Sequence, residues 1–118
     1  MEIENILQTN PSKIARASSQ AEDLRHKWQQ SKENYNKAEA KFILTLKATK
    51  TDLKATEMKY YINNSDNLFE NRMFLIGFES DYRKKECEVK ALEEELRAVK
   101  MLARIKIQEM GNLEGSVR

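Results

Sequence analysis

Apolar side chains recur along the first half of the chain at alternating intervals of three and four residues. This spacing is typical of one buried face of a long α-helix, as in a coiled coil. No proline or glycine falls between residues 12 and 48. The pattern predicts a helix from about residue 11 into the high 40s. Its seam, the row of residues on the buried face, is Ile14, Ala17, Ala21, Leu24, Trp28, Ser31, Tyr35, Ala38 and Phe42.

The start of this helix is predicted at Asn10-Pro11, because asparagine is a good N-cap and proline suits the first helical position. Residues 1–10 are then a short N-terminal arm. After Phe42 the apolar residues leave the heptad spacing, and residues 42–48 alternate in a way that also fits a short strand. A helix is the favoured interpretation, because helical patterns lie on both sides.

A second helical pattern fills the last third of the chain. Residues 55–61 predict a short helix, and the run Asn-Asn-Ser-Asp predicts a turn near residues 62–66. Gly111 and Gly115 favour a helix end there, which leaves residues 111–118 as a flexible C-terminal tail. The seam of this last helix is Leu68, Leu75, Phe78, Tyr82, Val89, Leu92, Leu96, Val99 and Ala103, with polar residues Asn71 and Lys85 at the skipped positions.

Two seams of similar length joined by a turn predict an all-α fold, a long antiparallel helical hairpin over residues 11–110 that resembles a coiled coil. A two-helix hairpin encloses little core, so it is a poor monomer. Residues 73–78 are also apolar on every side of the helix, and one seam covers only one side. We therefore expect a homo-oligomer, with a closed ring as one arrangement, whose interface contains Met73, Phe74, Leu75, Ile76 and Phe78.

The net charge of the chain and its distribution limit the kinds of polyanion that the protein is expected to bind. Charged residues make up 34% of the 118 residues, and the net charge is only +2, which is unlike the strongly basic balance of a duplex-DNA binder. Residues 1–60 hold 11 basic and 8 acidic side chains, whereas residues 61–118 hold 10 basic and 11 acidic ones. Any site for a polyanion should therefore lie in the first half.

No motif for catalysis, nucleotide binding or metal binding is present, so neither an enzyme nor a cofactor, metal or small-molecule substrate is predicted. His26 is the single histidine, and it lies between two basic residues on a solvated face. Cys87 is the single cysteine and cannot form an internal disulfide. Without a leader or an apolar run long enough to cross a membrane, the chain predicts a cytoplasmic protein with no membrane partner.

Residues 41–50, with the sequence KFILTLKATK, contain lysines but no carboxylate. On a continuous helix, lysines 47, 50 and 54 would share one face, and nearby threonine hydroxyls could donate to phosphate oxygens. The alternative interpretation is a solvated face that lacks acids by chance. Tyr60 and Tyr61 lie off any seam and could stack on bases. The candidate nucleic-acid-binding residues are Lys41, Lys47, Lys50 and Lys54.

Three further elements carry a family resemblance: Trp28 in the early helix, Leu46-Lys47-Ala48, and Thr56-Glu57-Met58-Lys59 followed by an Asp-containing turn and a long helix. Over roughly residues 28–107, this order resembles the UvsY family, the recombination mediators of T-even-like bacteriophages. The resemblance implies a small, helical, ring-forming protein in the cytoplasm of a bacterial host cell. It implies single-stranded DNA as ligand, with a recombinase and a single-strand-binding protein as partners, and it assigns backbone contacts to Lys47 and Lys50.

Two functional hypotheses follow. The first is a single-stranded DNA-binding recombination mediator or accessory protein that helps load a recombinase during phage recombination or replication. The second is a non-enzymatic coiled-coil scaffold, structural or adaptor protein of a phage without affinity for nucleic acid. The two hypotheses differ in whether the lysines of residues 41–54 meet phosphates.

Overall fold

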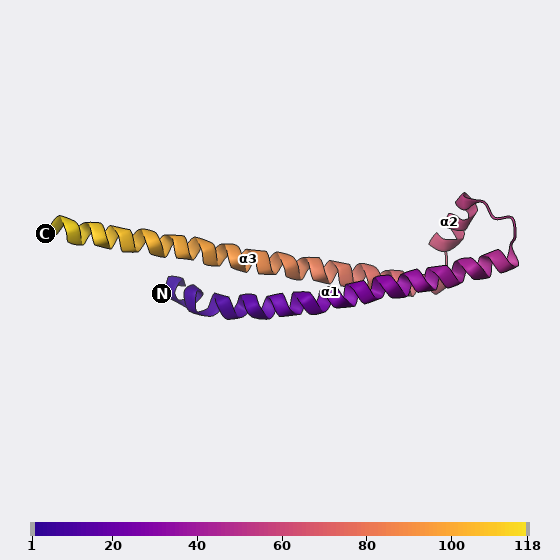
Figure 1. Cartoon of the computed structure of the whole chain (residues 1–118), viewed down its shortest axis with the longest axis horizontal. Helices are drawn as coiled ribbons and strands as arrows, with labels where there is room; N and C mark the ends of the chain where they lie inside the picture. Colours follow the sequence, from indigo (N-terminus) through magenta and orange to yellow (C-terminus); the bar gives the residue numbers. More distant parts are fainter. Residues whose placement is uncertain (1, 118) are drawn as a thin grey trace. The chain divides into compact units, whose positions relative to one another are not determined.

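The computed structural model describes the backbone of residues 2–117 and the side chains of residues 2–111. The described part contains three α-helices and no strand: α1 (Glu2–Thr49), α2 (Ala55–Asn63) and α3 (Asp66–Val117), as Figure 1 shows. The predicted all-α class is confirmed. The segment after Phe42 is helical as far as Thr49, and the predicted turn lies between Asn63 and Asp66.

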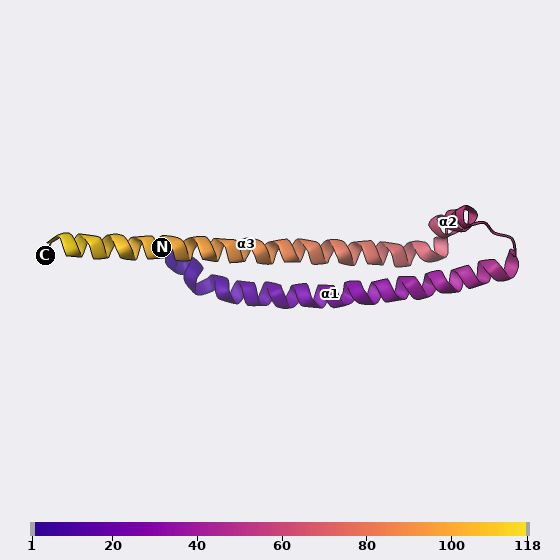
Figure 2. The ribbon, with the colours of Figure 1, turned by 45° about the horizontal axis from the view of Figure 1, so that its top comes forward.

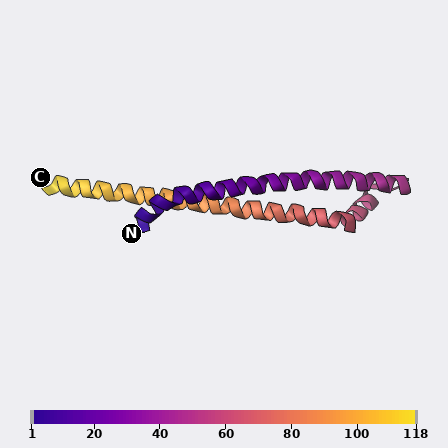
Figure 3. The same cartoon turned by 90° about the horizontal axis from the view of Figure 1, so that it is seen from below.

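The chain divides into two compact units. The terminal unit comprises Met1–Ala21 with Lys84–Arg118, and the central unit comprises Glu22–Arg83. In each unit, a segment of α1 lies beside a segment of α3 that runs in the opposite direction (Figures 2 and 3). The central unit also contains α2 and the two short connections around it.

The predicted seams are the buried faces in both units. Every predicted seam residue of α1 and α3 is buried or half-buried, including the polar members Ser31, Asn71 and Lys85. The most buried apolar side chains are Ala17 and Val99 in the terminal unit and Leu68 in the central unit, with 3%, 7% and 1% of their surface exposed. The heptad spacing therefore identified the packed face of each long helix correctly.

The predicted start of the first helix is wrong. Helix α1 begins at Glu2, Pro11 lies inside it, and Asn10 is buried instead of capping the helix. Ile3, Leu7 and Asn10 continue the heptad spacing of the seam toward the N-terminus, and none of them is exposed. Their packing offsets the roughly 3 kcal/mol that an interior proline costs a helix. The ribbon bends near this end, as expected beside a proline (Figure 2).

The other predicted helix end also differs from the structure. Helix α3 continues to Val117, because Gly111 does not adopt the positive φ that ends a helix with a glycine cap. Residues 104–111 are all exposed, so this part of α3 has no packed face within the terminal unit. The flexible tail predicted for residues 111–118 has a helical backbone up to Val117, and Arg118 lies outside the described residues.

Candidate nucleic-acid interface

The four candidate lysines lie around the end of α1 and the start of α2. Lys41 and Lys47 belong to α1, Lys50 follows its last residue, and Lys54 is the N-cap residue of α2 with an extended backbone. All four are exposed, and none has an ion pair within the described residues. The expectation that lysines 47, 50 and 54 share one helix face is wrong, because the helix ends at Thr49.

Two of the three threonines of this segment, Thr45 and Thr49, are bonded to their own helix. Thr45 Oγ1 donates to the Lys41 carbonyl at 3.0 Å, and Thr49 Oγ1 lies 3.1 Å from the Thr45 carbonyl and 3.2 Å from that of Leu46. Such bonds satisfy the hydroxyl donors locally and are common where helices bend or end. The last helical backbone bond runs from Lys50 N to Leu46 O at 2.7 Å. The hydroxyl groups of Thr45 and Thr49, which were predicted to donate to phosphate, therefore already donate to carbonyl groups of α1.

Lys50 connects the end of α1 with α2 through Tyr61. Its ammonium group donates a hydrogen bond to the Tyr61 hydroxyl and lies 4.1 Å from the ring centre. Tyr60 packs edge-to-face on Tyr61, with ring centres 5.8 Å apart, and remains 64% exposed. The structure thus brings one candidate lysine and both candidate tyrosines together, and one aromatic ring stays open to solvent.

An open hollow of about 300 Å³ lies on the surface of α2 beside these tyrosines. Thr56, Glu57, Tyr60 and Tyr61 line it. A flat aromatic ring next to a shallow hollow suits a nucleic acid base, since stacking does not depend on the identity of the base. The carboxylate of Glu57 repels phosphate, so a strand bound here would keep its backbone on the lysine side.

Arg72 of α3 holds α2 in position. Its guanidinium group donates to the Ile62 carbonyl at 2.9 Å and to the Asn63 carbonyl at 3.3 Å, at the C-terminal end of α2. A cation at this end also interacts favourably with the helix dipole. The sequence pattern did not identify Arg72, because its partners are backbone carbonyls that leave no signal in residue spacing.

The aromatic seam residues of α1, Trp28, Tyr35 and Phe42, are half-buried, as their place in the seam predicts. The Trp28 ring stacks on Tyr82, with ring centres 5.5 Å apart, and the Lys32 ammonium lies 4.0 Å from the Trp28 ring centre. Trp28 Nε1 is buried and has no hydrogen-bond partner within the described residues. These rings are half-buried between α1 and α3 of the central unit, so they are not available to stack on bases.

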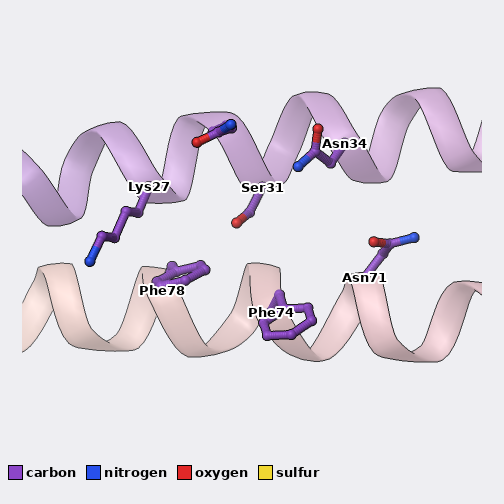
Figure 4. A pocket seen from close by; sticks show the side chains of 7 residues that line it. Lys27, Ser31, Asn34, Asn71, Phe74 and Phe78 are labelled. Carbon is purple, nitrogen blue, oxygen red and sulfur yellow. The ribbon is translucent and has the colours of Figure 1, made fainter.

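Ser31 leaves a gap in the seam of the central unit. A hollow of about 290 Å³ opens there, lined by Lys27, Gln30, Ser31, Asn34, Asn71, Phe74 and Phe78. Figure 4 shows Ser31 and Asn34 on one helix opposite Phe74, Phe78 and Asn71 on the other. The small serine faces two stacked phenylalanine rings whose centres are 6.3 Å apart. Amides around an apolar floor suit water or a small polar group.

The predicted interface residues divide into two sets. Leu75 and Phe78 are half-buried members of the seam within the central unit. Met73, Phe74 and Ile76 are 50–53% exposed. The predicted excess of apolar surface on residues 73–78 therefore exists: Phe74 borders the hollow opposite Ser31, and Met73 and Ile76 lie outside the seam.

A small charged cluster lies at the start of the central unit. Arg25 donates two hydrogen bonds to Glu22, at 2.5 and 3.1 Å, and His26 Nε2 lies 3.3 Å from the same carboxylate. The hydrogen bond from Arg25, helped by the charges of Arg25 and His26, lowers the pKa of Glu22 from its ordinary value. Glu22 and His26 are exposed and Arg25 is half-buried, so the cluster lies at the surface of the central unit.

Neither a metal site nor a membrane span is found in the described part of the chain. Within the described residues, no three histidine, cysteine or acidic side chains lie close enough together to hold a metal ion. None of the three helices, as far as they are described, combines the length and apolar character needed to cross a bilayer. No family model, characterised protein or solved structure matches this chain.

Proposed function

We propose that this protein binds single-stranded DNA through the lysine segment, residues 41–54, together with Tyr60 and Tyr61. The observation that carries the proposal is the group formed by Lys50, Tyr60 and Tyr61, in which a cation and an exposed aromatic ring lie side by side. Proteins that bind single strands without sequence preference combine positive charge for the backbone with aromatic rings for the bases.

The charge around this group supports the proposal. The four lysines are exposed and lack ion pairs within the described residues, so their charge is available to phosphates. Binding would release counterions from the strand, and this release would supply most of the affinity. One chain offers only a small patch, so several copies acting together would be needed for tight binding. Self-association is therefore part of the proposal.

The biological role that we propose comes from the resemblance to phage recombination mediators. In that role the protein would help to load a recombinase onto single-stranded DNA while a single-strand-binding protein is displaced. The competing function is a scaffold or adaptor that self-associates without binding DNA. The exposed apolar side chains Met73, Phe74 and Ile76 fit self-association in either case.

The test is fluorescence anisotropy of labelled oligo-dT, titrated with the protein at several salt concentrations. Replacing Lys47 and Lys50 together by alanine should weaken binding on every sequence, and the log–log salt slope should fall by about 0.7 for each phosphate that is no longer neutralised. Tyr60→Ala should weaken binding by about 1–3 kcal/mol without changing the slope, because it removes stacking only.

The matched control is a double variant of two exposed lysines outside the segment, Lys13→Ala with Lys84→Ala, which removes the same charge. It should retain most of the affinity. If the wild-type protein self-associates yet does not bind oligo-dT even at low salt, the DNA-binding proposal is wrong and the scaffold or adaptor function stands.

A further inference from the structure

Helix α3 carries a second apolar row in the central unit, on the side away from the seam. Phe69, Met73 and Ile76 follow one another at intervals of four and three residues, which places them on one helix face. Their side chains are 57%, 50% and 53% exposed. At 100° per residue these three residues lie about 100–160° around the helix from the seam residue Leu75. Burying it against a partner would remove apolar surface from water.

Polar residues extend this row at both ends. Asp66 lies three residues before Phe69, and Ser80 and Arg83 lie four and seven residues after Ile76. We name the six residues Asp66, Phe69, Met73, Ile76, Ser80 and Arg83 the outer stripe. Their intervals of 3, 4, 3, 4 and 3 are the same in both directions along the helix. The stripe is acidic at one end, apolar in the middle and basic at the other end.

We propose that the outer stripe binds the outer stripe of a second copy of this chain, antiparallel, about a two-fold axis between Met73 and Ile76. Asp66 of each copy then faces Arg83 of the other, and Met73 faces Ile76. A parallel pairing would place Asp66 against Asp66 and Arg83 against Arg83, which is unfavourable. The charge pattern therefore selects a second, antiparallel copy. The proposal rests on the self-association included in the proposed function.

The end residues are accessible for such pairing. Asp66 is exposed, and 61% of the Arg83 side chain is exposed. Arg83 also contacts Glu79 at 3.2 Å in an exposed ion pair, and its guanidinium carbon lies 5.6 Å from the Trp28 ring centre of α1, so a second carboxylate would share the guanidinium group with these contacts. Gly77, one turn after Met73, has open space where a Cβ would lie, so a neighbouring helix could approach there.

The size of the stripe sets the expected strength. Its 17 residue steps span about 26 Å of helix, which is short for a protein–protein interface. We expect a dimer with a dissociation constant in the micromolar range. A two-fold contact closes on itself, so a ring would need a second contact elsewhere on the chain.

Sedimentation velocity of the full chain without DNA, from a few to several hundred micromolar, tests the proposal. Asp66→Lys and Arg83→Glu should each weaken dimerisation by about tenfold, because each places like charges opposite one another. The double variant, Asp66→Lys with Arg83→Glu, should restore it. Asp81→Lys, which reverses an exposed acid of α3 outside the outer stripe, is the matched control and should change little.

A second variant tests the apolar centre. Ile76→Asp should weaken dimerisation more than a hundredfold while the helical circular dichroism stays unchanged, because Ile76 is outside the seam. Leu44→Asp, at an apolar residue of α1 that is 68% exposed, is the control for a nonspecific loss of surface apolarity.

The proposal is overturned by a wild-type protein that stays monomeric over this concentration range, by single charge reversals that leave dimerisation unchanged, or by a double variant that does not recover. DNA binding is measured separately with oligo-dT. If the outer stripe does not mediate dimerisation but the protein still binds oligo-dT in a salt-dependent way, only the dimer proposal is wrong. If the protein dimerises through the outer stripe but does not bind oligo-dT, only the DNA-binding proposal is wrong.

Discussion

The central and terminal units use the same heptad spacing but stabilise it differently. In the central unit, large aromatic rings meet across the seam, such as Trp28 on Tyr82, and Ser31, the polar interruption of the α1 seam, borders a hollow. In the terminal unit, the most buried apolar residues are aliphatic, and the polar residue Asn10 donates a hydrogen bond to Glu95 at 2.9 Å. We infer that ring packing fixes the register in one unit and a polar bond fixes it in the other.

The largest expected effect comes from removing the most buried apolar side chain. Leu68→Ala should lower the free energy of unfolding by about 2–5 kcal/mol, because it deletes a side chain that is 1% exposed in the central unit. Val99→Ala in the terminal unit removes less volume and should cost less. Urea unfolding, followed by circular dichroism and by the fluorescence of Trp28, measures both. Because Trp28 lies in the central unit, its fluorescence reports that unit directly. Equal losses of unfolding free energy in the two variants would contradict the expectation that deleting the larger buried side chain costs more.

A medium effect is expected at Asn10, the buried polar residue of the terminal unit. Its Oδ1 atom is buried and has no partner within the described residues, and its Nδ2 atom bonds only Glu95 and, at 3.5 Å, the Leu92 carbonyl. Asn10→Leu should raise the free energy of unfolding by about 1 kcal/mol, because it removes an unsatisfied polar group from the seam.

The same substitution should make the pairing of the helices less specific, since a buried asparagine often fixes the register of a coiled coil. Thermal unfolding followed by circular dichroism measures the stability. A broader transition would indicate that the helices pair in more than one register. Ser31→Ala is the matched change in the central unit and should alter stability little. A large loss of stability in Asn10→Leu would show that the bond to Glu95 contributes more than the unpaired oxygen costs.

The smallest expected effect lies on the surface of the central unit. Hydrogen bonding by Arg25, together with the charges of Arg25 and His26, lowers the pKa of Glu22 in the folded chain. The stabilisation that ionised Glu22 contributes is therefore fully present above the pKa that Glu22 has in the unfolded chain. It is lost as the pH falls through the lower pKa that Glu22 has in the folded chain. Glu22→Gln should slightly flatten the decline in melting temperature between neutral and acidic pH. An unchanged acid profile would show that this exposed cluster contributes nothing measurable.

The heptad pattern predicted the packed faces well, because burial follows directly from the spacing of apolar residues on a helix. It also predicted the short helix that the structure shows as Ala55–Asn63. It failed at Asn10-Pro11, where the local preference for a helix start competed with a seam that continues to Ile3. Local preference is the weaker influence when apolar packing continues past the proline.

The candidate site was predicted only in part. The sequence identified residues 41–50 as a lysine-containing stretch without a carboxylate and placed Tyr60 and Tyr61 off any seam, but it put the lysines on a continuous helix that in fact ends before Lys50. The contact between Lys50 and Tyr61, and the bonds from Arg72 to the end of α2, join residues about ten positions apart. Such contacts depend on the path of a short connection, which periodicity does not describe.

The exposed end of α3 has a kinetic consequence. Residues 104–111 are all exposed in the terminal unit, so their helical turns are held mainly by their own backbone hydrogen bonds. A single helix of this kind opens and closes far more often than one with a buried face. Arg104 and Lys106 lie in this stretch, so a protease that cleaves after basic residues would reach them well before the basic residues beside the seam. Trimming by such a protease would leave a shorter α3 with both packed units intact.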